Sequence, residues 1–241
     1  QSKHVAGPFE GELGELTAGL RKFNRADSHW SVSRLETYKS CPLRFWAQYG
    51  LSLVEQRIPA LGLESFQMGS ILHQILEEVY QAVADPANVE LLLQQLPAVA
   101  KRIFEEAPEK YQFEPTVYWK TQQDEWLLLL SVAIQGLASD DWIPLAFEQK
   151  FGLDDNPALR IVLQDGRSIS LHGVIDRIDG DGHGNLRVID YKTGSSHLDK
   201  EDILRGTRLQ LPLYALAAMQ VFERGEVTEG FYWSLNAKKA G

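Results

Sequence analysis

The chain has 241 residues, and its 24 Lys and Arg against 33 Asp and Glu leave a formal net charge of -9. Apolar residues make up 44% and charged residues 24%, a composition that excludes disordered, collagen-like and coiled-coil proteins. The length is sufficient for a sizeable hydrophobic core. The acidic balance argues against a protein that coats DNA non-specifically, because phosphate binding depends on clustered Lys and Arg. The acidic balance does not exclude an enzyme with a local basic surface.

Cys41 is the only cysteine, so this chain forms no internal disulfide and no multi-cysteine metal or iron-sulfur site. A reducing, cytoplasmic setting is therefore expected. No run reaches the roughly 18 apolar residues of a membrane span, and no signal peptide is expected at the start of the chain. Because Gln1 is not an initiator residue, we expect a segment cut from a longer polypeptide.

The first part of the chain is predicted to be irregular and then helical. Residues 1–30 mix Gly, Pro and charge with weak periodicity, which predicts an irregular leading arm. From residue 31 the run SVSRLETYKSCPLRFWAQYG predicts a short helix with a capping box from Ser33 to Glu36, a turn at Pro42 and a second helix.

A stronger helix is predicted over residues 66–83, because apolar side chains recur there at helical spacing. Its exposed face is expected to carry Gln74, Glu77 and Glu78. Further helical segments are predicted to about residue 140, with breaks at Pro97, Pro108 and Pro115. We expect a helical insertion over about 82–143, inside a domain that spans 31–241.

After residue 144 the pattern changes to the period of two that is typical of strands. The runs are FEQKF, RIVL, SISLHGVIDRI and NLRVIDYK, and turn-rich segments separate them. A helix over about 202–224 and a last strand near 230–235 follow. From residue 66 onward, leaving the insertion aside, the predicted order is α-β-β-β-α-β, an α/β fold with a hairpin-rich sheet.

The hairpin GVIDRIDGDGHGNLRVIDYKTG carries the clearest chemistry. Asp176 lies near the end of one strand and Asp190 and Lys192 lie on the next, where alternation places Asp190 and Lys192 on one face. Two carboxylates that meet across a hairpin suit a hard divalent cation such as Mg2+, and a neighbouring lysine could orient or deprotonate water. The alternative is a pair of surface acids beside a solvated lysine.

Five segments, in chain order, are similar to those of the PD-(D/E)xK nuclease superfamily, in particular the nuclease domains of bacterial RecB and AddB helicase-nucleases. They are VSRLETYKSCPLRFW, GSILHQILEEVY, GVIDRID, RVIDYKTG and QLPLYALA, over about residues 31–217. The resemblance implies a restriction-endonuclease-like α-β-β-β-α-β core, with a mixed sheet flanked by helices.

The same resemblance implies roles for individual residues. Carried over by position, it makes Asp176 and Asp190 the metal carboxylates, Lys192 the catalytic lysine and the main-chain carbonyl of Tyr191 a further ligand. His73 matches the metal-binding histidine of the RecB-like branch, although a single His beside an apolar stripe is otherwise a hydrogen-bonded structural residue. Mg2+ or Mn2+ is the implied cofactor.

Three more residues are candidates for a supporting role. Glu148 corresponds to an acidic position that often precedes the catalytic hairpin, and a solvated Glu on a strand is the alternative. Gln210 and Tyr214 lie four apart, so on a helix they share a face. The resemblance implies that they support the site or contact DNA, and a polar edge on a packing helix is the alternative.

Two departures from the family pattern matter. Some AddB-like relatives hold an iron-sulfur cluster through four cysteines. This chain has only Cys41, so we expect no cluster here and expect Cys41 to be a packed residue. Ile175 stands where the superfamily has the Pro of its name. Two other functions are not supported by the motifs. The chain has no phosphate-binding loop of an ATP-driven motor. The segment DGDGHGN is better explained as a Gly-rich turn than as a calcium-binding loop.

The resemblance thus implies a metal-dependent DNA nuclease, with exonuclease action on single-stranded ends and a helicase motor, fused or in a complex, as partner. It implies a role in recombination and double-strand-break repair, and products with 5'-phosphate and 3'-hydroxyl ends. Residues 31–57 carry four bases against two acids with aromatics between them, which predicts a DNA path, although these aromatics could equally be core. The bases and aromatics are Arg34, Lys39, Arg44 and Arg57 with Tyr38, Phe45, Trp46 and Tyr49. Alternatives are a catalytically silent scaffold of the same fold, or a stand-alone RecB-like nuclease of CRISPR adaptation or repair.

Overall fold

The computed structural model describes residues 29–53, 62–138, 140–194, 198–222 and 225–235. Its helices are α1 (Val32–Ser40), α2 (Pro42–Phe45), the π-helix η3 (Trp46–Gly50), α3 (Ser65–Gln81), α4 (Val89–Tyr111), α5 (Trp119–Leu137), α6 (Lys200–Arg205) and α7 (Gln210–Phe222). Its strands are β1 (His29–Ser31), β2 (Ile143–Phe151), β3 (Leu159–Val162), β4 (Ser168–Gly180), β5 (Asn185–Lys192) and β6 (Glu226–Ser234). The predicted order holds for α3, β2, β4, β5, α7 and β6, and β3, which the run RIVL predicts, lies outside that order.

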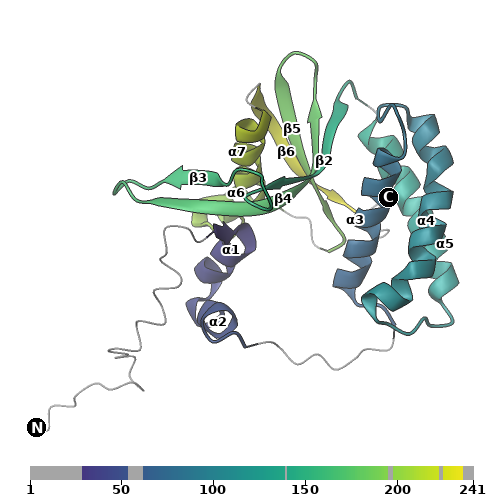
Figure 1. Cartoon of the computed structure of the whole chain (residues 1–241), viewed down its shortest axis with the longest axis horizontal. Coiled ribbons are helices and arrows are strands. Elements are labelled where there is room, and N and C mark those ends of the chain that lie inside the picture. Colours follow the sequence, from purple (N-terminus) through teal and green to yellow (C-terminus); the bar gives the residue numbers. More distant parts are fainter. Residues whose placement is uncertain (1–28, 54–61, 139, 195–197, 223–224, 236–241) are drawn as a thin grey trace, which may run out of the picture.

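Strand β4 organises the mixed sheet. Its first half pairs in parallel with β1 and antiparallel with β3, and its second half pairs antiparallel with β2 and β5. Strand β6 completes the sheet in parallel with β5. Figure 1 shows the hairpin of β3 and β4 projecting away from α3, α4 and α5. The second half of β4 is therefore the part that faces the helical layer.

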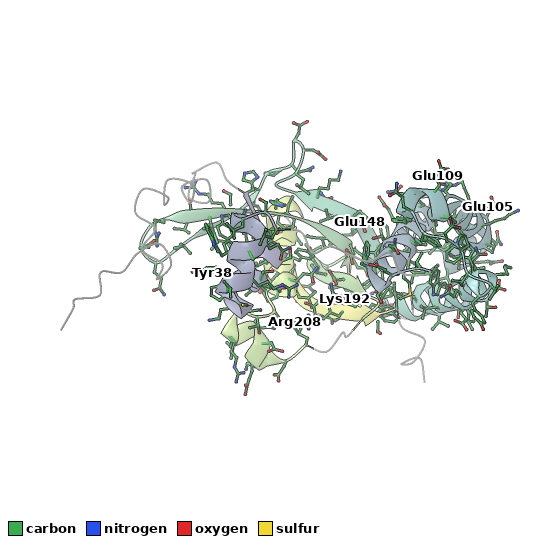
Figure 2. The ribbon with its side chains drawn as sticks, turned by 90° about the horizontal axis from the view of Figure 1, so that it is seen from below. Tyr38, Glu105, Glu109, Glu148, Lys192 and Arg208 are labelled. Atoms are coloured by element: carbon green, nitrogen blue, oxygen red, sulfur yellow. The ribbon has the colours of Figure 1, made fainter. Side chains whose placement is uncertain are left out.

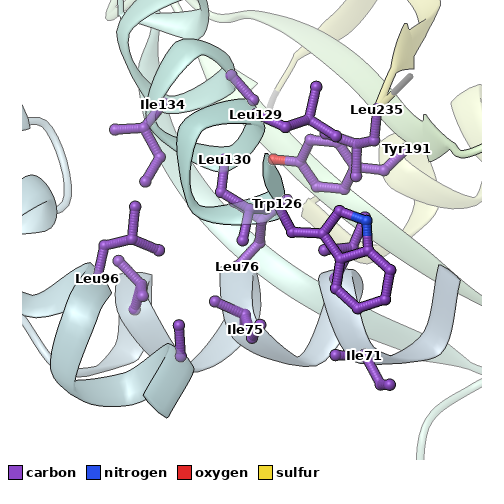
Figure 3. Packing of buried hydrophobic residues seen from close by; sticks show 14 of the residues in the cluster. Ile71, Ile75, Leu76, Leu96, Trp126, Leu129, Leu130, Ile134, Tyr191 and Leu235 are labelled. Carbon is purple, nitrogen blue, oxygen red and sulfur yellow. The ribbon is translucent and has the colours of Figure 1, made fainter. Parts of the chain in front are cut away.

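Two hydrophobic clusters form the core. One joins α3, α4 and α5 to the sheet, and Figure 3 shows Ile75 and Leu130 packed near Tyr191 and Leu235. The other joins α7 to the opposite side, where Leu213 packs with residues of β4 and β5. Each buried Leu or Ile stabilises the fold by about 1.5–3 kcal/mol. The helices of the expected insertion thus share one core with β5, while the domain limits remain a prediction.

The C-terminal helical region differs from the single helix predicted over 202–224. It consists of α6 and α7, because Gly206 takes the left-handed conformation (φ 74) that ends α6. Its backbone N–H bonds to carbonyls of Asp202 and Ile203. Helix α7 then begins afresh at Gln210.

Other boundaries also differ from the predictions. Helix α4 runs through Pro97 and Pro108, because its continuous buried face outweighs the lost backbone hydrogen bonds. Helix α1 is capped by Ser31, whose side chain accepts from the N–H of Arg34, and not by Ser33. None of the helices in the described ranges is both long enough and apolar enough to cross a membrane.

The polar face of α3 is half-buried, where an exposed face was predicted. Gln74 accepts hydrogen bonds from Lys110 Nζ (2.7 Å) and Tyr111 Oη (3.2 Å), and Glu78 pairs with Arg102. These contacts attach α3 to α4 by polar as well as apolar groups. The face is half-buried because α4 packs against it, and no local pattern in the sequence of α3 reveals this long-range contact.

Candidate active site

The hairpin of β4 and β5 presents its acids as the strand alternation predicts. The Tyr191 side chain lies in the core under α3 and α5, while Asp190 and Lys192 form an ion pair on the other face of β5. Asp176 on β4 is hydrogen-bonded to β5, because its Oδ2 accepts from the backbone N–H of Tyr191 at 2.7 Å. Both carboxylates are buried.

Glu148 reaches this site through an unusual backbone. Its φ of 44° lies in the left-handed region within strand β2, a conformation that costs about 1–3 kcal/mol for a residue with a side chain. The strand changes faces there, because Phe147 packs under the helices and Phe151 packs on the α7 side. Since Phe147 pairs with Arg177 and Gln149 pairs with Ile175, Glu148 lies opposite Asp176.

His73 on α3 completes a group of three possible metal ligands. Its Nδ1 lies 3.5 Å from Asp176 Oδ2 and 3.9 Å from Glu148 Oε1, and one ligand atom from each residue lies within 4.8 Å of the others. Its Nε2 lies 3.1 Å from the Tyr191 carbonyl, which can only accept, so this nitrogen carries the hydrogen. Nδ1 then faces the carboxylates, and this placement matches a metal-ligating histidine whose other nitrogen makes an outer hydrogen bond.

Asp190 and the Tyr191 carbonyl make hydrogen bonds within the protein. Asp190 lies outside the close group of three, and its Oδ1 accepts from Gln210 Nε2 at 2.6 Å. Its buried Oδ2 forms an ion pair with the Lys192 ammonium. The Tyr191 carbonyl accepts from His73. The ligand roles of both remain a prediction.

Gln210 holds the lysine and the acid together. Its Oε1 accepts from Lys192 Nζ at 2.9 Å, while its Nε2 donates to Asp190 and, at 3.3 Å, to Tyr214 Oη. Tyr214 packs edge-to-face on Phe151, with ring centroids 5.9 Å apart. The shared helix face predicted for Gln210 and Tyr214 therefore points to Lys192 and Asp190.

A supporting residue that the sequence does not reveal is Glu36 on α1. Its Oε1 accepts from the backbone N–H groups of Leu209 and, at 3.1 Å, Gln210. It thus caps the start of α7 from a distant part of the chain. The local pattern explains Glu36 as part of a capping box, and its acidic character offers no pointer to α7.

A second group outside the predictions is a buried ion network beneath the site. Arg177 and Arg187 both bond to Asp179, with Arg177 Nε to Asp179 Oδ1 at 2.6 Å. Arg177 also donates to Tyr80 Oη at 2.7 Å. Arg187 also pairs with Asp140, so two acids balance the two guanidinium groups, and the network fixes the relative positions of β4, β5 and α3. The alternating charges of Arg177 and Asp179 in GVIDRID were the available signal.

The carboxylates of the site are harder to ionise than free acids. Burial, and next the charge of Asp190, raises the pKa of Asp176 to about 8. Burial, and next Asp176, raises the pKa of Glu148 to about 7. Burial also raises the pKa of Asp190, against the opposing effect of Lys192. Because a bound cation favours the ionised acids, this set is suited to exchange its protons for a metal ion.

The site opens into a cavity of about 580 Å³. His73, Glu148 and Lys192 line it, together with the last turn of α4. Figure 2 shows Glu148 and Lys192 where the sheet meets the helical layer, well apart from Glu105 and Glu109 on α4. A substrate therefore has access to the candidate ligands and to the lysine from one side.

Comparison with known proteins identifies the family. A family model described as the PD-(D/E)XK nuclease superfamily matches residues 29–241. The chain belongs to this superfamily. An ATP-dependent helicase/deoxyribonuclease subunit from Caldanaerobacter subterraneus subsp. tengcongensis is 31% identical over 217 residues, which cover 83% of this chain and 18% of that protein.

Two proteins with the same name show similar agreement with this nuclease domain. The one from Carboxydothermus hydrogenoformans is 31% identical over 217 residues, covering 86% of the chain and 20% of the relative. The one from Moorella thermoacetica is 32% identical over 206 residues, covering 78% and 17%. The chain therefore spans about a fifth or less of the length of these relatives.

Cys41 of the nuclease domain is exposed, where a packed residue was predicted. Its Sγ accepts from the backbone N–H of Arg44 at 3.4 Å and so caps the short helix α2. A side chain that caps a helix start must stay beside the free N–H groups, which here lie at the surface.

The expected DNA path along residues 31–57 divides into packed and exposed aromatics. Phe45 is buried and stacks with Trp30, and the Arg34 guanidinium lies 4.3 Å from the Trp30 ring centroid. Tyr38 is 54% exposed. Arg57 lies outside the described residues. The segment is thus core for Phe45 and surface for Tyr38, and its contact with DNA remains a prediction.

Proposed function

We propose that this chain is a metal-dependent deoxyribonuclease domain that hydrolyses phosphodiester bonds, with exonuclease action on single-stranded ends. The observation that carries the proposal is the convergence of His73, Glu148 and Asp176 from α3, β2 and β4 to within 4.8 Å, beside Lys192. The superfamily supports phosphodiester hydrolysis, and the name of the relatives supports DNA as the substrate.

The donor atoms fit a divalent cation. One imidazole nitrogen and two carboxylate oxygens suit Mg2+ or Mn2+, and the buried carboxylate of Asp190, which pairs with Lys192, could complete the set. His73, Glu148 and Asp176 would hold the cation, with Asp190 and the Tyr191 carbonyl as further ligands. The cation would stabilise charge on the phosphate and lower the pKa of a water molecule.

Lys192 would act on the attacking water and the phosphate. Its ammonium is oriented by Gln210 and by Asp190, so it does not rotate freely. A fixed positive charge stabilises the charge that develops on the phosphate during in-line attack. Gln210 and Tyr214 would keep the lysine in place, and the products would carry 5'-phosphate and 3'-hydroxyl ends.

The two alternatives are less well supported. A silent scaffold would be expected to have lost a site residue, whereas this chain has His73, Asp176, Asp190 and Lys192. A stand-alone nuclease is disfavoured because the relatives are about five times longer and are named as helicase subunits. We infer a cytoplasmic helicase-nuclease with the motor fused or in a complex, active in recombination and double-strand-break repair.

The test is cleavage of labelled single- and double-stranded DNA with Mg2+, Mn2+ or EDTA. Lys192→Ala and Asp190→Ala should each lower the rate by about a hundredfold or more, because each removes a charge at the reacting phosphate or cation. Lys150→Ala is the matched control, since Lys150 forms an exposed ion pair with Asp154 and does not line the cavity of the site. Cleavage in EDTA, or full activity of both site variants, would refute the proposal. DNA binding without any cleavage would favour the scaffold.

A further inference from the structure

The cavity at the site extends beyond the candidate ligands to residues with no part in the proposed chemistry. Phe66 and Gln74 on α3 line it, and so do Lys110 and Tyr111 in the last turn of α4. Phe66 is 53% exposed although it is a large apolar side chain. A helical layer that serves only packing would have no reason to place a cation and two aromatic rings around this space.

Lys110 and Tyr111 are held in place before any ligand arrives. The Oε1 of Gln74 accepts from both Lys110 Nζ and Tyr111 Oη. The buried Gln67 donates to the Tyr111 carbonyl at 2.8 Å, so the backbone is fixed as well. Side chains that are already ordered lose less conformational entropy on binding, which is typical of a binding surface.

The charged groups of the cavity alternate in sign. Lys192 and Lys110 line it together with two acids, Glu148 of the metal site and Glu77. A phosphate bound at the cation would leave the next phosphate of the strand near acids unless a second positive group received it. Lys110 supplies that group, and aromatic rings beside a cation are the combination that binds single-stranded nucleic acid.

We propose that this cavity holds the nucleotide that flanks the scissile phosphate, with Lys110 on its phosphate and Phe66 stacked on its base. The proposal rests on the proposed nuclease function and names its substrate class: DNA whose base is unpaired and unstacked at this position. It also assigns a role to α4, whose C-terminal turn becomes part of the substrate site.

The experiment measures binding to fluorescently labelled oligodeoxythymidylate and to an abasic oligonucleotide of equal length, with Mg2+, in a Lys192→Ala background that leaves the DNA intact. Phe66→Ala should weaken binding of oligodeoxythymidylate about tenfold, the loss of one base stack, and leave abasic DNA unaffected. Lys110→Gln should weaken both and lower the slope of log Kd against log salt by about one contact.

Two matched controls separate these effects from folding and net charge. Tyr118→Ala removes an exposed ring beside α5, and Lys101→Gln removes an exposed charge on α4, and neither residue lines the cavity. Both should bind as the parent does, and melting temperatures show that each variant is folded. Equal losses for both oligonucleotides in Phe66→Ala, or a Lys110→Gln variant that matches Lys101→Gln, would overturn the inference.

Parallel cleavage by the unmodified chain distinguishes the two levels of the proposal. If that chain cleaves DNA with Mg2+ while the cavity variants bind like the controls, the nucleotide site is refuted and the nuclease function stands. If it cleaves with no metal, the proposed function fails. A parent that binds neither oligonucleotide at low salt would also overturn the nucleotide site.

Discussion

Glu36 offers a sharp test of how the fold positions Lys192, the proposed catalytic lysine. Its carboxylate accepts two backbone hydrogen bonds at the start of α7, and Gln210, the first residue of α7, holds Lys192 and Asp190. Glu36→Ala removes the cap while it leaves every residue of the site in the chain. Glu36→Gln keeps an oxygen that can accept.

The magnitude follows from the kinds of contact. Loss of a capping side chain costs about 0.5–2 kcal/mol, and loss of a negative charge at a helix start costs about 0.3–1 kcal/mol more. We therefore expect Glu36→Ala to lower the free energy of unfolding by about 1–3 kcal/mol. A small displacement of Gln210 would move Lys192, so kcat should fall by about tenfold or more with little change in KM. Glu36→Gln should recover most of the rate.

The assay is single-turnover cleavage combined with urea unfolding, in a double-mutant cycle with Gln210→Ala. If Glu36 acts through Gln210, the double variant should be no slower than Gln210→Ala alone. Asp199→Ala is the matched control, because Asp199 caps α6 by accepting from the N–H of Glu201 at 3.0 Å. It should lose similar stability and keep its activity. Additive rate losses, or an equal rate loss in Asp199→Ala, would refute the reasoning.

Three further predictions concern the site and its support. Because burial raises the pKa of Asp176 to about 8, the folded metal-free protein binds more protons than the unfolded chain above pH 4. Its melting temperature should therefore fall from about pH 4 to 8, while the stabilisation by Mg2+ should grow over the same range. In Asp176→Asn both trends should weaken, and unchanged trends would contradict the assigned pKa. A Cβ on Gly173 would lie 2.8 Å from the Phe151 ring, so Gly173→Ala should lose about 1–3 kcal/mol by denaturant unfolding, unlike Gly230→Ala. Asp179→Ala leaves the buried Arg177 guanidinium without its carboxylate and Arg187 with only the carboxylate of Asp140 among the described residues, and it should cost about 3–5 kcal/mol in the same assay, against at most about 1 kcal/mol for the exposed Asp165→Ala.

The fold was largely predictable because its signals are local. Period-two runs marked β2 to β5, and the apolar stripe of residues 66–83 marked α3 within two residues of its ends. The break at Gly206 and the unbroken α4 were not predictable in the same way. Both depend on what packs against the helix, since Glu36 supplies the new cap of α7 and the buried face of α4 compensates for its prolines.

The sequence by itself determined that Asp190 and Lys192 share a face, because strand alternation is independent of the rest of the chain. Only the tertiary structure decided which acid joins His73 and Asp176. Glu148 does so through a left-handed backbone and its pairing with β4, features that no spacing encodes. The support from Glu36 was also invisible, since 173 residues separate it from Leu209. The local pattern thus identified β5 as the strand that carries Asp190 and Lys192, and long-range packing assembled the candidate site around it.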